Sequence, residues 1–301
     1  MTAISSIILA SLAVSVMMMI AWAVQKATHQ AGWADVFWSF AIGIGGLIVA
    51  LMTVSDAPIK RSWLAGAMVG FWSFAIGIGG LVVALMTDGD APVERAWLVA
   101  AMVGFWSLRL GFHILARTAA ATYEDPRYAD LRREWGDKFQ ARLFGFLQIQ
   151  ALCGIGLVAT VYAAAHRPGP AFAITDCLGL GLLIVSVIGE TLADRQLRAF
   201  TLDKANHGKV CDKGLWSWSR HPNYFFEWLG WVAYPVIAIS FHPYWWQGWL
   251  SLIGPLLMYW LLVHVSGIPP LEIHMLKSRG DAFKAYMART SAFIPLPPRK
   301  N

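Results

Sequence analysis

Long uninterrupted apolar runs dominate the chain, and polar residues gather between them rather than alternating within them. Runs of about 18 or more apolar residues are long enough to cross a bilayer as helices, whereas a transmembrane barrel would alternate. We therefore predict an all-α polytopic membrane bundle, a single integral membrane domain over residues 1–301. The predicted spans are 4–24, 33–52, 63–86, 96–116, 144–165, 171–191, 222–241 and 245–265.

The first run lacks the features of a cleaved leader. No positive residue precedes Ile4, and no clear small-residue cleavage pattern follows Val24, so we predict a retained helix. Composition agrees with a membrane protein, since 14% of residues are charged, roughly half the share of soluble proteins.

Basic residues are concentrated in three segments between spans: 119–142, 192–221 and the tail after residue 266. The intervening segments, 166–170 and 241–244, contain only Arg167. The positive-inside rule therefore predicts that the basic segments and the C-terminus are cytoplasmic. The formal net charge of +6 follows from this topology and does not indicate nucleic-acid binding.

A near-perfect tandem repeat occupies residues 37–104. Phe37–Leu47 recurs as Phe71–Leu81, an offset of 34 residues, and a third copy begins at Phe105 before diverging. One period holds one span and one short loop, so successive copies would point in opposite directions, unlike the repeats of a solenoid or inverted-repeat transporter. Keeping both copies gives eight spans and an internal N-terminus; removing one gives seven spans and an external N-terminus.

The densest polar chemistry is Ser219–Glu227, between a basic segment and an apolar one. If Pro222 begins a helix, Asn223 and Glu227 share a face one turn apart. A carboxylate at the start of a membrane helix is costly without a partner, which favours a functional role. The alternative is an interfacial turn, with Arg220 and His221 on lipid phosphates.

Glu190, Asp194 and Arg198 follow one another at helical steps of four. They predict either an ion-pair ladder or, with the lysines downstream, an anion site for nucleotide phosphates. In the tail, Glu272 follows two prolines that indicate a helix start. We predict a cytoplasmic tail helix within 267–301, with His274, Arg279, Tyr286 and Arg289 along one amphipathic helix that Pro295 ends.

Asp35 opens a predicted span, and only the first repeat copy has it: Val69 and Val103 occupy the equivalent positions. An intramembrane carboxylate is either neutralised or held by a partner, and Arg109, inside its own span, is a plausible one. Residues 124–128 look like a turn that leads into a helix. No second histidine lies at metal-ligand spacing from His221, which argues against a metal centre.

Three segments together resemble a known family: Gly214–Trp216, Ser219–Glu227 and Ser291–Pro295. The chain resembles bacterial steroid 5-alpha-reductase-like membrane proteins from about residue 33 to about residue 298, including 124–128. Related sterol reductases and isoprenylcysteine methyltransferases share an Arg-His-Pro-x-Tyr-like stretch, so this stretch does not choose the cofactor.

The resemblance implies a seven-helix reductase with NADPH on the cytoplasmic side. Asn223, Glu227 and Arg198 match cofactor-contacting residues, and Lys209 stands where the steroid enzymes have an arginine. The full set of implied cofactor residues is Glu190, Asp194, Arg195, Arg198, Lys209, Arg220, His221, Asn223, Tyr224, Glu227, Glu272, His274, Arg279 and Tyr286. Asp35 is the candidate catalytic acid; His113 lies in the segment that carries a second catalytic group, a tyrosine, which Ile114 replaces here.

The implied activity is hydride transfer from NADPH to an alkene conjugated to a ketone in a lipophilic, steroid-like substrate, in a bacterial cell membrane. Lipid is the surrounding partner, and no pattern specifies an oligomeric state. Two alternatives stay open: a membrane methyltransferase that uses S-adenosylmethionine, and a non-catalytic lipid-binding protein. The many cations in the cytoplasmic segments favour a multiply anionic cofactor over a cationic methyl donor.

Overall fold

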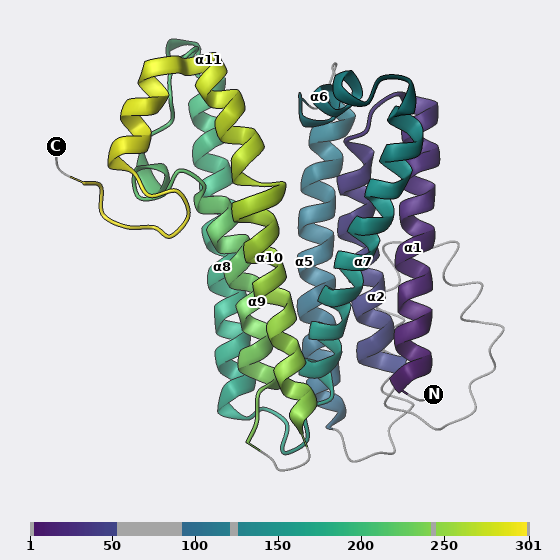
Figure 1. The fold of residues 1–301 in the computed structure, drawn as a ribbon. Coiled ribbons are helices and arrows are strands. Elements are labelled where there is room, and N and C mark those ends of the chain that lie inside the picture. Colours follow the sequence, from purple (N-terminus) through teal and green to yellow (C-terminus); the bar gives the residue numbers. More distant parts are fainter. Residues whose placement is uncertain (1–2, 53–91, 121–125, 242–244, 300–301) are drawn as a thin grey trace. The chain divides into compact units, whose positions relative to one another are not determined.

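The computed structural model describes residues 3–52, 92–120, 126–241 and 245–299 (Figure 1). These residues form helices, with a single isolated bridge between Ser219 and Ser291, so the all-α prediction is confirmed. Within the described part of the chain, six helices are long and apolar enough to cross a membrane. The predicted span 63–86, and with it most of the second repeat copy, lies outside the described residues.

The described helices overlap the predicted spans, although α8 (Ile174–Leu202) continues well past its predicted end, and three short elements make up the span 245–265. In chain order they are α1 (Ala3–Thr28), α2 (Trp33–Met52), α5 (Val93–Ala120), α6 (Pro126–Trp135), η1 (Gly136–Lys138), α7 (Phe139–Ala165), α8 (Ile174–Leu202), η2 (Lys204–Asn206), η3 (Gly214–Ser217), α9 (Pro222–Ala238), η4 (Trp246–Leu252), α10 (Ile253–Trp260), η5 (Leu261–Val265) and α11 (Ile268–Arg289). η5 is a short π-helix, and the other η elements are 3-10 helices.

The chain divides into two compact units. Unit 1 comprises Met1–Cys177 and Tyr234–Ile253, and unit 2 comprises Leu178–Ala233 and Gly254–Asn301.

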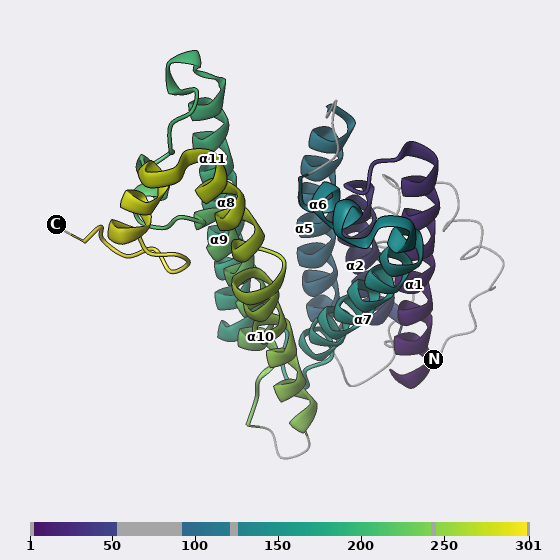
Figure 2. The same cartoon turned by 45° about the horizontal axis from the view of Figure 1, so that its top comes forward.

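Unit 1 is built on α1, α2, α5 and α7, which lie side by side in both views (Figure 1, Figure 2). Glycines let α2 and α5 approach closely: a Cβ on Gly43 would lie 2.1 Å from the Ser107 hydroxyl, and one on Gly46 would lie 2.9 Å from Val103. The Ser107 hydroxyl also donates to the Ser39 carbonyl at 2.9 Å. Small residues at such contacts are typical of packed membrane helices.

The same contacts fix the relative direction of α2 and α5. Gly32 meets Thr118 near the start of α2, whereas Gly46 meets Val103 nearer its end, so the two helices are antiparallel. Eight alternating spans would make them parallel, and seven would make them antiparallel. The observed direction is therefore the one expected for seven spans.

In unit 2, the later turns of α8 pack against α9. A Cβ on Gly189 would lie 2.4 Å from the Phe226 ring, so only glycine admits this ring. The Ser186 hydroxyl donates to the Phe226 carbonyl at 2.7 Å, and the Trp228 indole donates to the Pro255 carbonyl at 3.0 Å. These contacts fix α9 between α8 and α10.

Candidate functional site

A strip of polar side chains lies along the packed faces of α8 and α9. The Asn223 amide donates to Asp194 Oδ1 at 3.4 Å, and the Ser186 hydroxyl donates to the Phe226 carbonyl, so α8 and α9 run antiparallel. In this register Glu190 on α8 lies level with Glu227 on α9. Both glutamates are buried, with 6% of each exposed. We call these four residues the α8–α9 polar strip.

α9 begins at Pro222, so Asn223 and Glu227 lie one turn apart on one face, as predicted. The Trp231 indole, one turn further along, donates to Glu227 Oε1 at 3.1 Å. The carboxylate that the sequence marked as costly therefore receives a hydrogen bond from its own helix.

Exposed cations lie beyond the Asp194–Asn223 end of this strip. Arg195 and Arg198 are exposed on the last turns of α8, and Lys209 is exposed in the segment that follows. An anionic group next to the strip would therefore find guanidinium donors at the surface.

Arg220, in contrast, holds the C-terminal part of unit 2 in place. Its Nε donates to Glu272 Oε1 at 2.7 Å, and its Nη1 donates to the carbonyls of Thr290 at 2.6 Å and Met287 at 3.2 Å. His221 Nε2 lies 3.2 Å from the same Glu272 oxygen. The Arg220 side chain is thus engaged within the fold through its Nε and Nη1, and its role toward a cofactor stays a prediction.

Further hydrogen bonds join the same two segments. The Ser219 hydroxyl donates to the Phe293 carbonyl at 2.8 Å, the Arg220 amide donates to the Ser291 carbonyl at 2.8 Å, and the Tyr286 hydroxyl donates to the Trp216 carbonyl. We call residues 216–221, Glu272 and residues 286–293 the C-terminal clasp. It contains four of the predicted cofactor residues, Arg220, His221, Glu272 and Tyr286, and the His221 ring stacks on a fifth, Tyr224, at 5.6 Å.

The prediction of one amphipathic tail helix running to Pro295 is wrong. α11 ends at Arg289, and Gly280 interrupts it with φ +51° and ψ −124°, a conformation that favours glycine. Exposed His274 and half-buried Arg279 precede the break, whereas Tyr286 follows it and belongs to the clasp. These three predicted cofactor residues therefore do not share one helix face.

In unit 1, Asp35 accepts a hydrogen bond from the Tyr128 hydroxyl at 3.0 Å. Tyr128 lies on α6 and is 4% exposed. The sequence prediction named Arg109 as a partner and missed Tyr128, although the family-like stretch 124–128 ends at this residue and was the available signal. Glu124 and Asp125 lie outside the described residues. His113, the other predicted catalytic residue, is exposed on α5.

A family model described as "Protein of unknown function (DUF1295)" matches residues 69–290, more than two thirds of the chain. The chain belongs to this family. It is a family of steroid 5-alpha-reductase-like membrane proteins. No curated protein and no solved structure matches the chain. The matched residues include the α8–α9 polar strip, Tyr128 and His113, but Asp35 precedes them.

Proposed function

We propose that the protein is an NADPH-dependent membrane reductase that reduces a carbon–carbon double bond conjugated to a ketone in a lipophilic, steroid-like substrate. The observation that carries the proposal is the α8–α9 polar strip, in which buried carboxylates and an amide adjoin exposed guanidinium groups. Membership of a steroid 5-alpha-reductase-like family supports the same reaction class.

The donor and acceptor groups of the strip fit a reduced dinucleotide. Carboxylates at Glu190, Asp194 and Glu227 accept hydrogen bonds from ribose hydroxyls or a carboxamide, and Arg195 and Arg198 suit phosphates. NADPH would supply the hydride. Arg220 is left out of the phosphate contacts because the C-terminal clasp engages it.

We assign polarisation of the substrate ketone to Asp35 and Tyr128. The Tyr128 hydroxyl donates to Asp35 Oδ1, and Asp35 in its acid form would donate its own O–H to the ketone oxygen, where negative charge develops as the enolate forms. A surrounding bilayer would exclude water and admit a lipophilic substrate, and a water-poor site strengthens such hydrogen bonds.

The test is cofactor binding and turnover by the protein purified in lipid nanodiscs. We expect NADPH, and not NADH, to raise the unfolding temperature and to be oxidised in the presence of a steroid enone. Arg198→Ala and Glu227→Gln should each raise the apparent Kd for NADPH at least about tenfold, which corresponds to a loss of about 1.4 kcal/mol of binding free energy. Arg299→Ala, at an exposed arginine of the tail, is the matched control. Unchanged NADPH binding in both site variants would contradict the proposal.

The strip also supports a second candidate. Three carboxylates attract a cation, and the sulfonium of S-adenosylmethionine is cationic, so methyl transfer is the competing function. Protection by S-adenosylmethionine in place of NADPH would establish this alternative. Protection by neither cofactor would favour a non-catalytic lipid-binding protein.

A further inference from the structure

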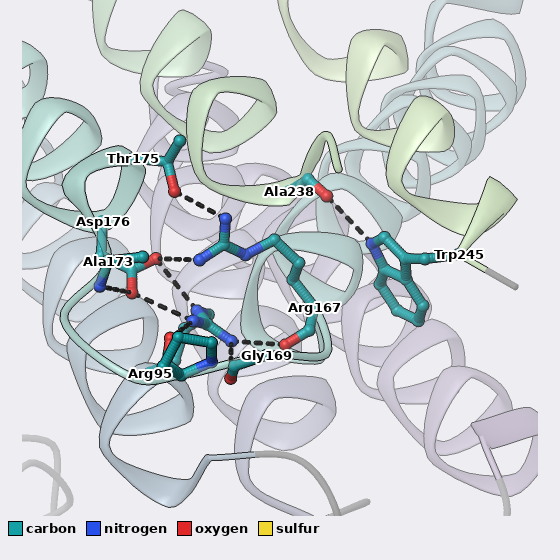
Figure 3. Close-up of polar contacts among 9 residues, drawn as sticks. Arg95, Arg167, Gly169, Ala173, Thr175, Asp176, Ala238 and Trp245 are labelled. Atoms are coloured by element: carbon teal, nitrogen blue, oxygen red, sulfur yellow. Dashed lines mark hydrogen bonds and ion pairs between the residues drawn. The ribbon is translucent and has the colours of Figure 1, made fainter. Parts of the chain in front are cut away.

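Three charged side chains of unit 1 meet where α5 begins, α7 ends and α8 begins (Figure 3). Arg95, Arg167 and Asp176 are buried, with exposed fractions of 1%, 6% and 1%. Charged groups are rarely buried to this degree unless their charges are paired. Any charge in this cluster that is left without a counter-charge therefore costs free energy.

The Asp176 carboxylate is already saturated. Its Oδ1 accepts from Arg95 Nε at 2.9 Å and from Arg167 Nη2 at 3.1 Å. Its Oδ2 accepts from Arg95 Nη2 at 3.1 Å and from the Ala173 amide at 3.0 Å. Among the described residues, this one carboxylate pairs with both guanidinium groups, so the three side chains carry one excess positive charge.

The two guanidinium groups differ in how far their donors are used. Arg95 also donates to the carbonyls of Arg167, Gly169 and Pro170, so each of its nitrogens has a partner (Figure 3). Arg167 Nη1 donates to the Thr175 hydroxyl at 2.6 Å. Its Nε is buried and, among the described residues, has no hydrogen-bond partner.

The surroundings of Arg167 disfavour the positive charge of its guanidinium group. Burial first, and then the neighbouring Arg95, lower the pKa of Arg167, while Asp176 opposes them. α8 begins at Ile174, so the positive end of its dipole points to the same place. The adjacent His166 adds no compensating negative charge.

We propose that this cluster binds one small, singly charged anion at Arg167 Nε. A water molecule would satisfy the N–H donor but leave the buried charge uncompensated, whereas an anion does both. The required chemistry is one negative charge with a hydrogen-bond acceptor. A dissolved halide supplies it, and so does the phosphate of a lipid headgroup.

Two sets of samples distinguish these sources. In dodecyl maltoside micelles, which contain no phosphate, chloride is titrated against gluconate at constant ionic strength; in halide-free buffer, micelles without and with added phosphatidylglycerol are compared. We expect a saturating rise of a few degrees in the unfolding temperature with chloride, with phosphatidylglycerol, or with both. A rise in the first set alone identifies the halide, and a rise in the second alone identifies the lipid phosphate.

Arg167→Gln should abolish the rise, because it removes both the excess charge and the Nε–H donor. Arg299→Gln, at an exposed arginine, should retain it. An equal rise in wild type and Arg167→Gln, or no rise in either set of samples, would overturn the proposal.

A second measurement needs no variant and covers the case in which Arg167→Gln does not fold. Crystals of the wild-type protein grown with bromide should give an anomalous peak within hydrogen-bonding distance of Arg167 Nε. If the peak is missing and phosphatidylglycerol has no effect, the site binds no anion.

Discussion

A single hydrogen bond links two candidate residues of unit 1, Asp35 and Tyr128. The Tyr128 phenol donates to the Asp35 carboxylate at 3.0 Å while itself being 4% exposed. Removing one partner of a buried hydrogen bond leaves the other unsatisfied, which costs about 1–3 kcal/mol. The Asp35 side chain is thus held in place by the Tyr128 hydroxyl.

Tyr128→Phe should therefore reduce turnover of an enone about tenfold or more, and lower the free energy of unfolding by about 1–3 kcal/mol. NADPH affinity should not change, since Tyr128 is not in the α8–α9 polar strip. Steady-state kinetics and thermal unfolding measure the two effects. Tyr259→Phe, at a tyrosine that is 40% exposed, serves as the control. Wild-type turnover in Tyr128→Phe would limit Tyr128 to a structural role.

A second residue-scale prediction concerns His166, which follows α7. Burial lowers the pKa of His166 from 6.5 to about 4, although its Nδ1 contact with the Tyr162 carbonyl acts in the opposite direction. Below about pH 6.5 the unfolded chain binds the proton first, so stability should fall as the pH drops from 6.5 to about 4, and be unaffected above 6.5.

The expected slope is at most about 1.4 kcal/mol per pH unit, and His166→Gln should reduce it. Unfolding temperatures measured across this pH range test the sign. His207→Gln, which alters an exposed histidine between α8 and α9, should leave the pH dependence unchanged. Stability that stays constant in wild type down to pH 4 would show that His166 is not buried in its neutral form.

At the scale of helices, unit 2 depends on segments that are distant in sequence. The C-terminal clasp joins η3 and the start of α9 to the end of α11, and its partners are mostly backbone carbonyls. Phe293 adds an apolar anchor, since its ring lies 5.8 Å from those of Phe225 and Trp228. The tail is therefore an integral part of unit 2 rather than a separate surface helix.

The break in α11 gives an element-scale prediction. Gly280 has φ +51°, and a Cβ there would meet nothing within 4 Å, so Gly280→Ala carries only a backbone penalty. We expect the free energy of unfolding to fall by about 1–2 kcal/mol. Gly145→Ala is a matched control, because Gly145 also has open space but lies in a regular part of α7. Alanine there should be neutral, or stabilising by up to about 1 kcal/mol. Equal effects of the two substitutions would contradict the assigned backbone strain.

For the whole molecule, hydropathy was sufficient to locate the long apolar helices of the described residues, because apolar length decides whether a segment can span a membrane. Helical periodicity predicted one face of the polar strip, since a period of 3.6 residues puts Asn223 and Glu227 on the same side of α9. The sequence could not predict the carbonyl partners of Arg220, because an arginine that binds phosphate and one that binds carbonyls look alike in sequence. Tyr128 and Arg95 were missed for a related reason: their carboxylate partners, Asp35 and Asp176, are more than 70 residues away along the chain.

The direction of α2 relative to α5 has a consequence for the whole chain. In unit 1 Asp35 begins α2 at the end where α6 lies, next to the basic segment 119–142 that is predicted to be cytoplasmic. A short connection joins the end of α1 to the start of α2, so α1 ends at the same face and begins at the opposite one. The N-terminus should therefore lie on the face opposite the basic segment. An eight-span chain would place it on the same face instead.

Labelling with a membrane-impermeant thiol reagent can decide between these topologies, in a chain whose three native cysteines are replaced. A cysteine placed before Met1 and Gly169→Cys should react in intact cells, whereas Lys138→Cys and Arg299→Cys should react only after permeabilisation. The last three positions are common to both topologies and act as internal controls, so only the N-terminal cysteine discriminates. If it is protected while Gly169→Cys reacts, α2 runs in the other direction, and Asp35 lies on the face away from the predicted cofactor side.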